Sequence, residues 1–312
     1  MNFSDLNTLG KRREPFLFIS DFKAEKLKVF LLSELKEQDI EFKIDEFYKH
    51  ENHKSILQKE PINFNDYKIK FEKVQEKIKK GETYILNLTQ PTKITTELSL
   101  KEIYTRANAH YKLRFKDEFV CFSPEKFVQI KDDTIHTFPM KGTIDASMQR
   151  AKEKILADEK EMAEHIMIVD LLRNDLSIVA KDVKVENFRF ITEIEAGEKK
   201  LLQVSSHISG KVGENWHANI GTILEALLPA GSISGAPKKS TLEIIQNIEE
   251  YERGYFSGVF GLYDGKKLDS GVMIRFIEKN EIAFIYKSGG GITLDSNALS
   301  EYNELNDKIY LP

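Results

Sequence analysis

Short strand-like runs and segments of helical period alternate along the chain. Residues 16–19 predict a strand, and the apolar spacing over residues 24–37 predicts an amphipathic helix. Residues 38–62 are charged and show no clear period. A helix is then expected from Asn65-Asp66 to Lys80-Gly81, because a cationic last turn precedes a glycine that ends the helix.

The middle and the end of the chain continue this alternation. Strands are expected over residues 82–94 with an interruption at Pro91, and over 118–122, 126–130, 134–138, 183–192 and 201–212. Helices are expected over 98–109, 147–172 with a break near Ala157-Asp158, 220–228 and 299–310. A capping box from Ser240 to Glu243 predicts that another helix starts at Ser240. An antiparallel meander is expected over residues 255–263, 270–277 and 282–287.

Helices segregated around antiparallel hairpins predict an α+β fold rather than a parallel, dinucleotide-binding sheet. No G-x-G-x-x-G follows a predicted strand, and the loop from Gly231 to Lys239 lacks the lysine spacing of a Walker A motif. No linker indicates an independent second unit. We therefore expect one catalytic unit over residues 63–312, with a short segment, 1–62, packed on its core.

Composition excludes several functional classes. The 312 residues are 41% hydrophobic and 31% charged, and the net charge of −4 gives no basic surface for nucleic acid. No apolar run approaches the roughly 18 residues that span a bilayer, and the N-terminus has no signal-peptide core. We expect a cytoplasmic protein without nucleic-acid or membrane partners. The single cysteine, Cys121, excludes an internal disulfide and is expected to be a buried, inert thiol.

One lysine is a candidate for chemistry. Lys141 lies in Phe138-Pro139-Met140-Lys141-Gly142-Thr143, directly after a predicted strand that Pro139 should end. Gly142 lets backbone approach a ligand, and Thr143 adds a hydroxyl. The amine is expected to project from the strand end. A surface lysine is the alternative that this motif alone favours.

Carboxylates recur at helical spacing on two predicted helices. Asp158, Glu161 and Glu164 share one face, as do Glu301 and Glu304, with Lys308 one turn further on. Each set alone is more typical of a solvated surface. Brought together, the two helices would form an oxygen-only site suited to Mg²⁺.

The meander supplies candidates for binding an anion. Gly289, Gly290 and Gly291 follow a predicted strand, where three flexible residues are costly unless backbone must approach a ligand; a flexible turn is the alternative. Tyr255 and Arg275 belong to neighbouring strands, and an inward arginine requires an anion or a structural salt bridge. The pattern indicates an anionic small-molecule site with Mg²⁺ and an activated lysine.

Taken together, these motifs resemble the chorismate-utilising enzymes, the family of anthranilate, aminodeoxychorismate, isochorismate and salicylate synthases. The resemblance runs from about Asn65 to the C-terminus. The matching motifs begin at Gly81, Ser123, Pro139, Asp158, Val169, Gly231, Gly289 and Glu301. It implies that the antiparallel sheets pack as a sandwich with helices on the outer faces.

Position 141 distinguishes subgroups within this family. Aminodeoxychorismate synthases typically read P-I-K-G-T here, and this chain reads P-M-K-G-T. The resemblance thus implies an aminodeoxychorismate synthase component I, acting on chorismate in 4-aminobenzoate and folate biosynthesis. The alternatives are anthranilate synthase component I, isochorismate-type activity with water in place of ammonia, and a non-catalytic homologue that serves as a binding subunit.

The resemblance also implies roles for individual residues. Lys141 would be the nucleophile and Glu125 the general acid; Glu164 and Glu304 would bind Mg²⁺ directly, with Glu161 and Glu301 acting through water. Substrate would be held by the other matching positions, which are Gly142, Thr143, Tyr255, Arg275, Gly289, Gly290, Gly291 and Lys308. Because no glutaminase cysteine motif is present, a glutamine amidotransferase subunit is the expected source of ammonia.

Overall fold

Two antiparallel sheets organise the chain. The computed structural model describes residues 2–45, 55–196 and 199–312. In those residues the first sheet contains β1 (Phe16–Ser20), β2 (Leu27–Leu31), β8 (Lys126–Lys131), β9 (Thr134–Thr137), β10 (Met140–Asp145), β11 (Lys181–Ala196), β12 (Lys199–Lys211), β14 (Val259–Tyr263) and β15 (Leu268–Val272). Its order is β10-β12-β9-β8-β15-β14-β1-β2, with β11 paired to β12.

The second sheet comes from other segments of the chain. It contains β3 (Ile40–Ile44), β4 (Gln58–Glu60), β5 (Ile85–Thr95), β6 (Tyr111–Phe115), β7 (Phe119–Ser123), β13 (Gly235–Ala236), β16 (Phe276–Lys279) and β17 (Phe284–Ile292). Its order in the described residues is β13-β5-β17-β16-β7-β6-β3, with β4 paired to β5.

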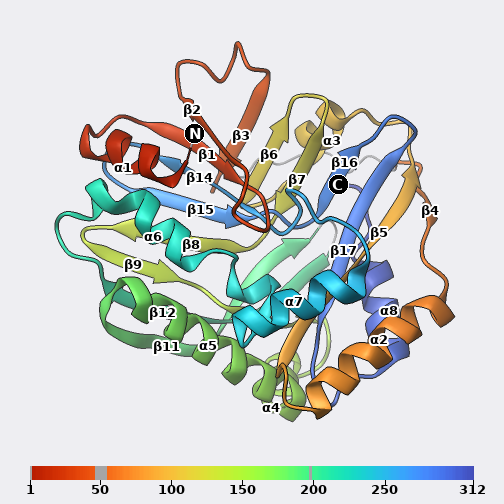
Figure 1. Ribbon diagram of the computed structural model, residues 1–312. Coiled ribbons are helices and arrows are strands. Elements are labelled where there is room, and N and C mark those ends of the chain that lie inside the picture. Colours follow the sequence, from red (N-terminus) through yellow and green to blue (C-terminus); the bar gives the residue numbers. More distant parts are fainter. Residues whose placement is uncertain (1, 46–54, 197–198) are drawn as a thin grey trace.

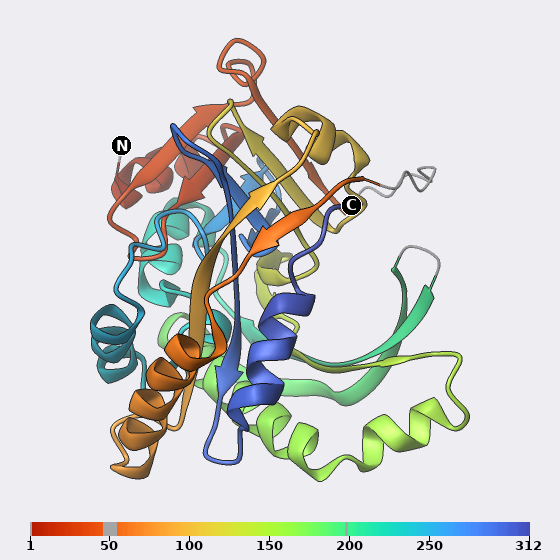
Figure 2. The same ribbon diagram turned by 90° about the vertical axis from the view of Figure 1, so that its right-hand side faces the viewer.

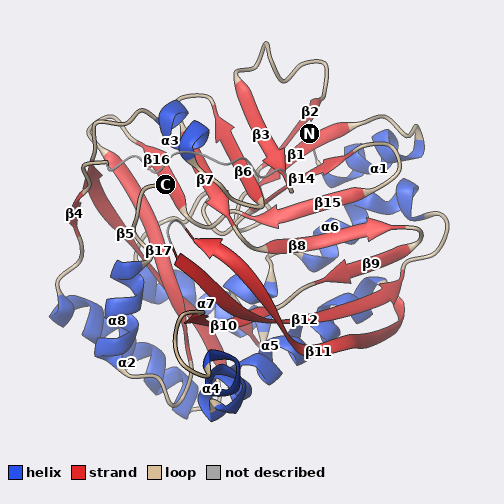
Figure 3. Cartoon of the chain, turned by 180° about the vertical axis from the view of Figure 1, so that it is seen from behind, coloured by secondary structure: helices blue, strands red, loops and turns tan. Residues whose placement is uncertain are grey.

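Helices cover the outer faces of the two sheets (Figures 1 and 3). They are α1 (Phe3–Lys11), α2 (Phe64–Lys79), α3 (Leu100–Arg106), α4 (Ala151–Ala157), α5 (Glu159–Val179), α6 (Ile220–Leu227), α7 (Lys238–Glu249) and α8 (Ala298–Asp307). The predicted α+β sandwich is confirmed. Within the described ranges, no helix combines the length and apolar character needed to cross a membrane.

The core has an inter-sheet part and a helix-facing part. Ile19, Leu113, Phe260 and Phe276 are fully buried between the sheets with Cys121, which is a free thiol as predicted. A larger cluster joins both sheets to the helices, where one fully buried side chain each comes from α1, α2 and α6: Leu6, Val74 and Leu224.

The N-terminal part differs from the prediction. Residues 24–37 do not form a helix, because β2 pairs with β1 and the Asp21 carboxylate accepts hydrogen bonds from the amides of Glu25 (2.9 Å) and Lys26 (2.8 Å). Those bonds fix a turn between the two strands. Within 38–62, expected to be irregular, β3 and β4 are regular strands, and residues 46–54 lie outside the described ranges. The division at residue 62 stays a prediction.

Three further predictions are wrong in detail. The helix α7 starts at Lys238 without a side-chain cap, because the Ser240 hydroxyl donates to the Glu82 carbonyl (2.8 Å) instead of closing a capping box. Strand β5 continues through Pro91, which pairs with β17 on one side. On the other side Pro91 has no strand partner within the described residues, since β13 pairs only with residues 85–86 of β5 and β4 only with residues 93–95, so its missing N–H costs no ladder bond there. The expected meander is divided, since β14 and β15 belong to one sheet and β16 and β17 to the other.

A long hairpin and a broken helix frame one end of the molecule (Figure 2). The break predicted near Ala157-Asp158 separates α4 from α5, and Asp158 accepts the amide of Glu161 at 2.9 Å. Strand β12 pairs with β11 along one side, and with β10 and then β9 along the other. This arrangement places β10 beside β12 at the end of the sheet, where α4 and α5 pack against both strands.

Candidate active site

Lys141 lies on a strand next to α5. Pro139 separates β9 from β10, as predicted, but Lys141 is the second residue of β10 and does not project from a strand end. The pairing of β10 with β12 shifts between Met140 and Thr143, where Gly142 has φ +83°. A Cβ at Gly142 would lie 3.2 Å from Glu161 Oε2, so the glycine allows this carboxylate to approach β10.

The structure brings the two carboxylate-bearing helices together, which helical spacing alone did not predict. Lys141 Nζ lies 3.9 Å from Glu164 Oε2 on α5. Lys160, one turn before Glu164, lies 3.8 Å from Glu164 Oε1 and 3.8 Å from Glu301 Oε1 on α8. One ammonium therefore links the acidic faces of two helices that are far apart in the sequence.

The electrostatics of this cluster fit a bound cation. Burial and the neighbouring carboxylate of Glu164 raise the pKa of Glu161 above its ordinary value. Burial also raises the pKa of Glu301, and the negative charge of Glu304 raises it further. Crowded carboxylates that resist ionisation are stabilised by added positive charge. The oxygen-only donor set suits Mg²⁺.

The side chains do not converge on a metal position as they stand. Among the described residues, no group of three acidic, histidine or cysteine side chains is arranged to hold a metal ion. Lys160 lies between Glu164 and Glu301, and its side chain is 47% exposed. A cation between the helices would compete with the Lys160 ammonium for the same two carboxylates.

The three consecutive glycines lie within β17 and do not form a loop after a strand. Gly290 and Gly291 face opposite sides of the strand: a Cβ at Gly290 would lie 3.3 Å from Glu301 Oε2, and one at Gly291 would lie 3.3 Å from Lys141 Nζ. Strand β16 pairs with β17 only up to Lys287, so in the described residues the next five backbone positions have a strand partner on the β5 side alone. Lys308 Nζ donates to the Gly289 carbonyl on β17 at 2.9 Å.

Lys308 also pairs with Glu304, at 2.6 Å. Burial raises the pKa of Glu304, but Lys308, Lys141 and Lys160 together outweigh it, so this pKa lies below its ordinary value. Burial lowers the pKa of Lys308 despite its acidic partner. The pair brings a cation to the open edge of β17, where backbone donors can join it in binding an anion.

Glu125 lies between β7 and β8 and is partly buried. Its carboxylate accepts a hydrogen bond from the Ser232 hydroxyl. Burial raises the pKa of Glu125, although Ser232, Lys141, Lys308 and Arg275 each act to lower it. The carboxyl therefore retains its proton at higher pH than an exposed glutamate, as a general acid requires.

An ion pair and hydrogen bonds from two cationic side chains hold the loop that carries Ser232. Lys238 Nζ lies 3.1 Å from Asp175 Oδ2 on α5, and it donates to the Leu227 carbonyl at 3.0 Å. The buried guanidinium of Arg253 donates to the Ile233 carbonyl at 2.9 Å. These contacts hold the Ser232 hydroxyl against Glu125.

Of the two predicted anion-binding side chains, Arg275 lies near the other site residues and Tyr255 does not. Arg275 precedes β16 with φ +51°, its Nε has no hydrogen-bond partner among the described residues, and its charge acts on Glu125 and Lys308. Tyr255 instead stacks on Phe119, with ring centroids 5.2 Å apart, and burial raises its pKa to about 12. The structure does not bring Tyr255 into the lysine cluster.

Ser232 and Lys160 belong to the site but were not predicted as site residues. Both lie inside motifs that the sequence marks, the loop from Gly231 to Lys238 and the acidic face of α5. The spacing of Lys160 four residues before Glu164 was the available signal for this ion pair.

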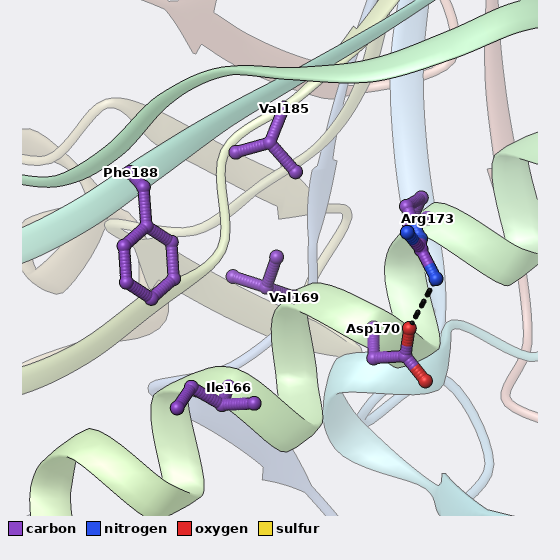
Figure 4. Close-up of a pocket in the computed structure, with 6 residues that line it drawn as sticks. All are labelled: Ile166, Val169, Asp170, Arg173, Val185 and Phe188. Carbon is purple, nitrogen blue, oxygen red and sulfur yellow. Dashed lines mark hydrogen bonds and ion pairs between the residues drawn. The ribbon is translucent and has the colours of Figure 1, made fainter.

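Two cavities lie near α5. The smaller, of about 180 Å³, adjoins the site and is lined by Gly142, Thr143, Ile144, Lys154, Ile155, Asp158 and Glu161. The larger, of about 390 Å³, is shallow and is lined by Ile166, Val169, Asp170, Arg173, Val185 and Phe188 (Figure 4). Its polar members, Asp170 and Arg173, form an ion pair at 2.7 Å. The larger cavity contains none of the predicted site residues.

The sequence of the chain is similar to those of several known proteins. The chain is 49% identical to an uncharacterized PabA-like protein from Haemophilus influenzae, over 98% of this chain and 94% of the relative. It is 34% identical to aminodeoxychorismate synthase component 1 from Salmonella typhimurium, over 78% of this chain and 56% of the relative. It is 32% identical to anthranilate synthase component 1 from Archaeoglobus fulgidus, over 77% of this chain and 60% of the relative.

A solved structure and a family model agree with these relatives. The fold matches MenF, the menaquinone-specific isochorismate synthase from Escherichia coli, with a TM-score of 0.74 and 14% identity over 97% of this chain and 79% of that one. The model of the chorismate binding enzyme family matches residues 16–311. The chain therefore belongs to the chorismate binding enzyme family.

Proposed function

We propose that the chain is an aminodeoxychorismate synthase component I, which converts chorismate and ammonia to 4-amino-4-deoxychorismate and water. The observation that carries the proposal is the placement of Lys141, whose amine lies between Gly291 and Glu164 instead of on a solvated surface. Overall identity to the aminodeoxychorismate and anthranilate synthases is similar, so the choice rests on the lysine.

In this mechanism the neutral amine of Lys141 attacks C2 of the chorismate ring, the double bond shifts, and the C4 hydroxyl leaves. Glu125 gives its proton to the departing oxygen, so that water is released. Ammonia then adds at C4, the double bond shifts back, and the lysine leaves C2. The proton lost by the added ammonia returns to Glu125, which completes the cycle.

The remaining side chains bind the substrate. Lys308, Arg275 and the open edge of β17 supply donors for the carboxylates of chorismate. Glu164 and Glu304, with Glu161 and Glu301 acting through water, would hold Mg²⁺, whose charge would offset that of a substrate carboxylate. These residues orient the ring relative to Lys141 and Glu125.

Ammonia is proposed to come from a glutamine amidotransferase partner. Hydrolysis of glutamine by such enzymes needs a reactive thiolate. The single cysteine, Cys121, is buried, and burial raises its pKa. This chain therefore offers no thiol for that reaction.

Product analysis with chorismate, Mg²⁺ and ammonium chloride tests the proposal. We expect 4-amino-4-deoxychorismate, and at least about 10²-fold slower turnover in Lys141→Ala. The matched control is Lys184→Ala, which removes an exposed lysine on β11. Without ammonia, intact-mass analysis should detect a chorismate-derived adduct on the wild type but not on Lys141→Ala. Direct formation of fluorescent anthranilate, or full activity of Lys141→Ala, would refute the proposal.

A further inference from the structure

Strand β11 contains a bulge at Arg189. The register between β11 and β12 shifts between Asn187 and Phe190, and Arg189 has φ +51°. A non-glycine residue with positive φ is uncommon, and bulges often redirect a side chain. Next to it, the ring of Phe188 packs edge-on against His165 of α5, with centroids 5.7 Å apart.

The guanidinium of Arg189 bonds to the end of α4. One terminal nitrogen donates to the Leu156 carbonyl at 2.9 Å, and the other donates to the Ile155 carbonyl at 3.0 Å. Carbonyls in the last turn of a helix have no intrahelical partner, so a cation there is stabilising. The first nitrogen also lies 3.1 Å from Met162 Sδ on α5. Arg189 thus joins both helices across their break at Asp158.

The backbone of Arg189 connects to a second set of contacts. Its amide donates to the Ser206 hydroxyl at 2.9 Å, and that hydroxyl lies 2.6 Å from Nε2 of the fully buried His165, the residue after Glu164. The amide of Ser206 donates to the Pro139 carbonyl at 3.0 Å, two residues before Lys141. Ser206 therefore links the bulge to the helix of the acidic cluster and to the strand of the nucleophile.

A side-chain contact completes the connection. The side chain of Ile155, whose carbonyl Arg189 binds, lies 3.6 Å from the position of a Cβ at Gly142. The carboxylate of Glu161 approaches the same glycine, at 3.2 Å. The distance between α5 and β10 at the site thus depends on where α4 ends, and Arg189 fixes that end.

We propose that Arg189 is a positioning residue that sets the distance between Lys141 and the carboxylates of Glu161 and Glu164. The proposal rests on the proposed function of those three side chains. Arg189 acts through the α4–α5 junction and through Ser206, and no substrate contact is assigned to it. Its loss should displace the first turn of α5 relative to β10 while leaving both sheets intact.

Kinetics of Arg189 variants test this positioning. In Arg189→Gln we expect kcat for chorismate turnover to fall roughly 10–100-fold and the Mg²⁺ concentration for half-activation to rise roughly tenfold. Arg189→Lys, which retains a cation able to reach one carbonyl, should recover part of both losses. The matched control is Arg173→Gln, which removes a half-exposed arginine farther along α5 and should change neither quantity.

Hydrogen exchange of the metal-free protein provides a readout independent of activity. Amides of residues 158–165 should exchange at least about tenfold faster in Arg189→Gln than in the wild type, while the sheets keep their protection. Arg189→Gln kinetics within twofold of the wild type would overturn the inference, and so would protection that falls uniformly across the chain. A wild type that does not convert chorismate would instead contradict the proposed function, since the exchange experiment does not depend on turnover.

Discussion

Adding a methyl group at Gly291 tests the placement of Lys141 without altering any polar side chain. In Gly291→Ala the new Cβ would lie 3.3 Å from Lys141 Nζ, closer than carbon and nitrogen normally pack, and 3.5 Å from Ile85 Cδ1, an ordinary contact. Among these neighbours the amine is the flexible group. We therefore expect the lysine to move and the strand to stay in place.

The expected loss is in chemistry and not in stability. Alanine is favoured over glycine within a strand by roughly 0.5–1 kcal/mol, so the free energy of unfolding should be unchanged or slightly higher. The amine has to give by only a few tenths of an ångström. Because a misplacement of about 1 Å costs roughly 10²-fold in rate, we expect a loss of roughly 5–10-fold, which corresponds to about 1.0–1.4 kcal/mol in the activation free energy. The measurements are initial rates of chorismate consumption with ammonium and Mg²⁺, and denaturant unfolding.

Gly289→Ala is the matched control on the same strand. Its Cβ would lie 2.5 Å from the Leu88 carbonyl oxygen, which belongs to the backbone and cannot turn away. This variant should lose roughly 1–3 kcal/mol of stability through overpacking. Turnover of Gly291→Ala within threefold of the wild type would refute the placement of the amine, as would a stability loss equal to that of Gly289→Ala.

Three further predictions concern an acid, a histidine and a buried ion pair. Ser232→Ala removes a hydrogen bond that lowers the pKa of Glu125, so the alkaline limb of the pH–rate profile should move to higher pH; a move to lower pH would contradict the acid role. Burial and the nearby Arg13 lower the pKa of His217 from 6.5 to about 4. Between these two pH values the unfolded chain binds a proton on this histidine that the folded protein does not. The contribution of His217 to the free energy of unfolding should be fully present above pH 6.5 and should fall by at most about 1.4 kcal/mol per pH unit as the pH drops toward 4. In His217→Gln, the free energy of unfolding measured with denaturant should depend less steeply on pH over this range than in the wild type. Glu249→Gln leaves Arg253 buried without its charge partner and should cost roughly 3–5 kcal/mol in denaturant unfolding, so a loss below 1 kcal/mol would count against that pair.

Local chemistry predicted the elements whose ends are fixed by their own residues. The helix α2 ends before Gly81, as expected. It begins at Phe64 and not at Asn65-Asp66, because the side chain of Asn63 caps the Asp66 amide. Residues 24–37 were predicted to form an amphipathic helix from their apolar spacing, and that prediction is wrong. Residues 27–31 form a strand because they pair with β1, and nothing within the segment itself indicates that partner.

The site divides in a similar way. Helical spacing was enough to predict that Glu161 and Glu164 share a face of one helix and that Glu301 and Glu304 share a face of another, because these relations are local. It did not predict that the two faces meet. The hydrogen bond from Ser232 to Glu125 spans 107 positions, and nothing near either residue indicates it. Arg189 acts through a bulge, which depends on register with a second strand.

The pairing of β1 with β14 has a consequence for how the chain acquires its fold. Phe16 lies opposite Tyr263, so β1 and the edge strand β2 join the larger sheet through β14, a strand more than 200 positions later in the sequence. At roughly 5–20 residues per second, a ribosome needs tens of seconds to deliver the second partner after the first. During that time β1 has only β2 as a partner among the described strands, and its other edge has none, whereas β11 and β12 follow each other directly in the sequence. We expect the larger sheet to close late in synthesis and the nascent N-terminal hairpin to be the segment that most needs protection from aggregation.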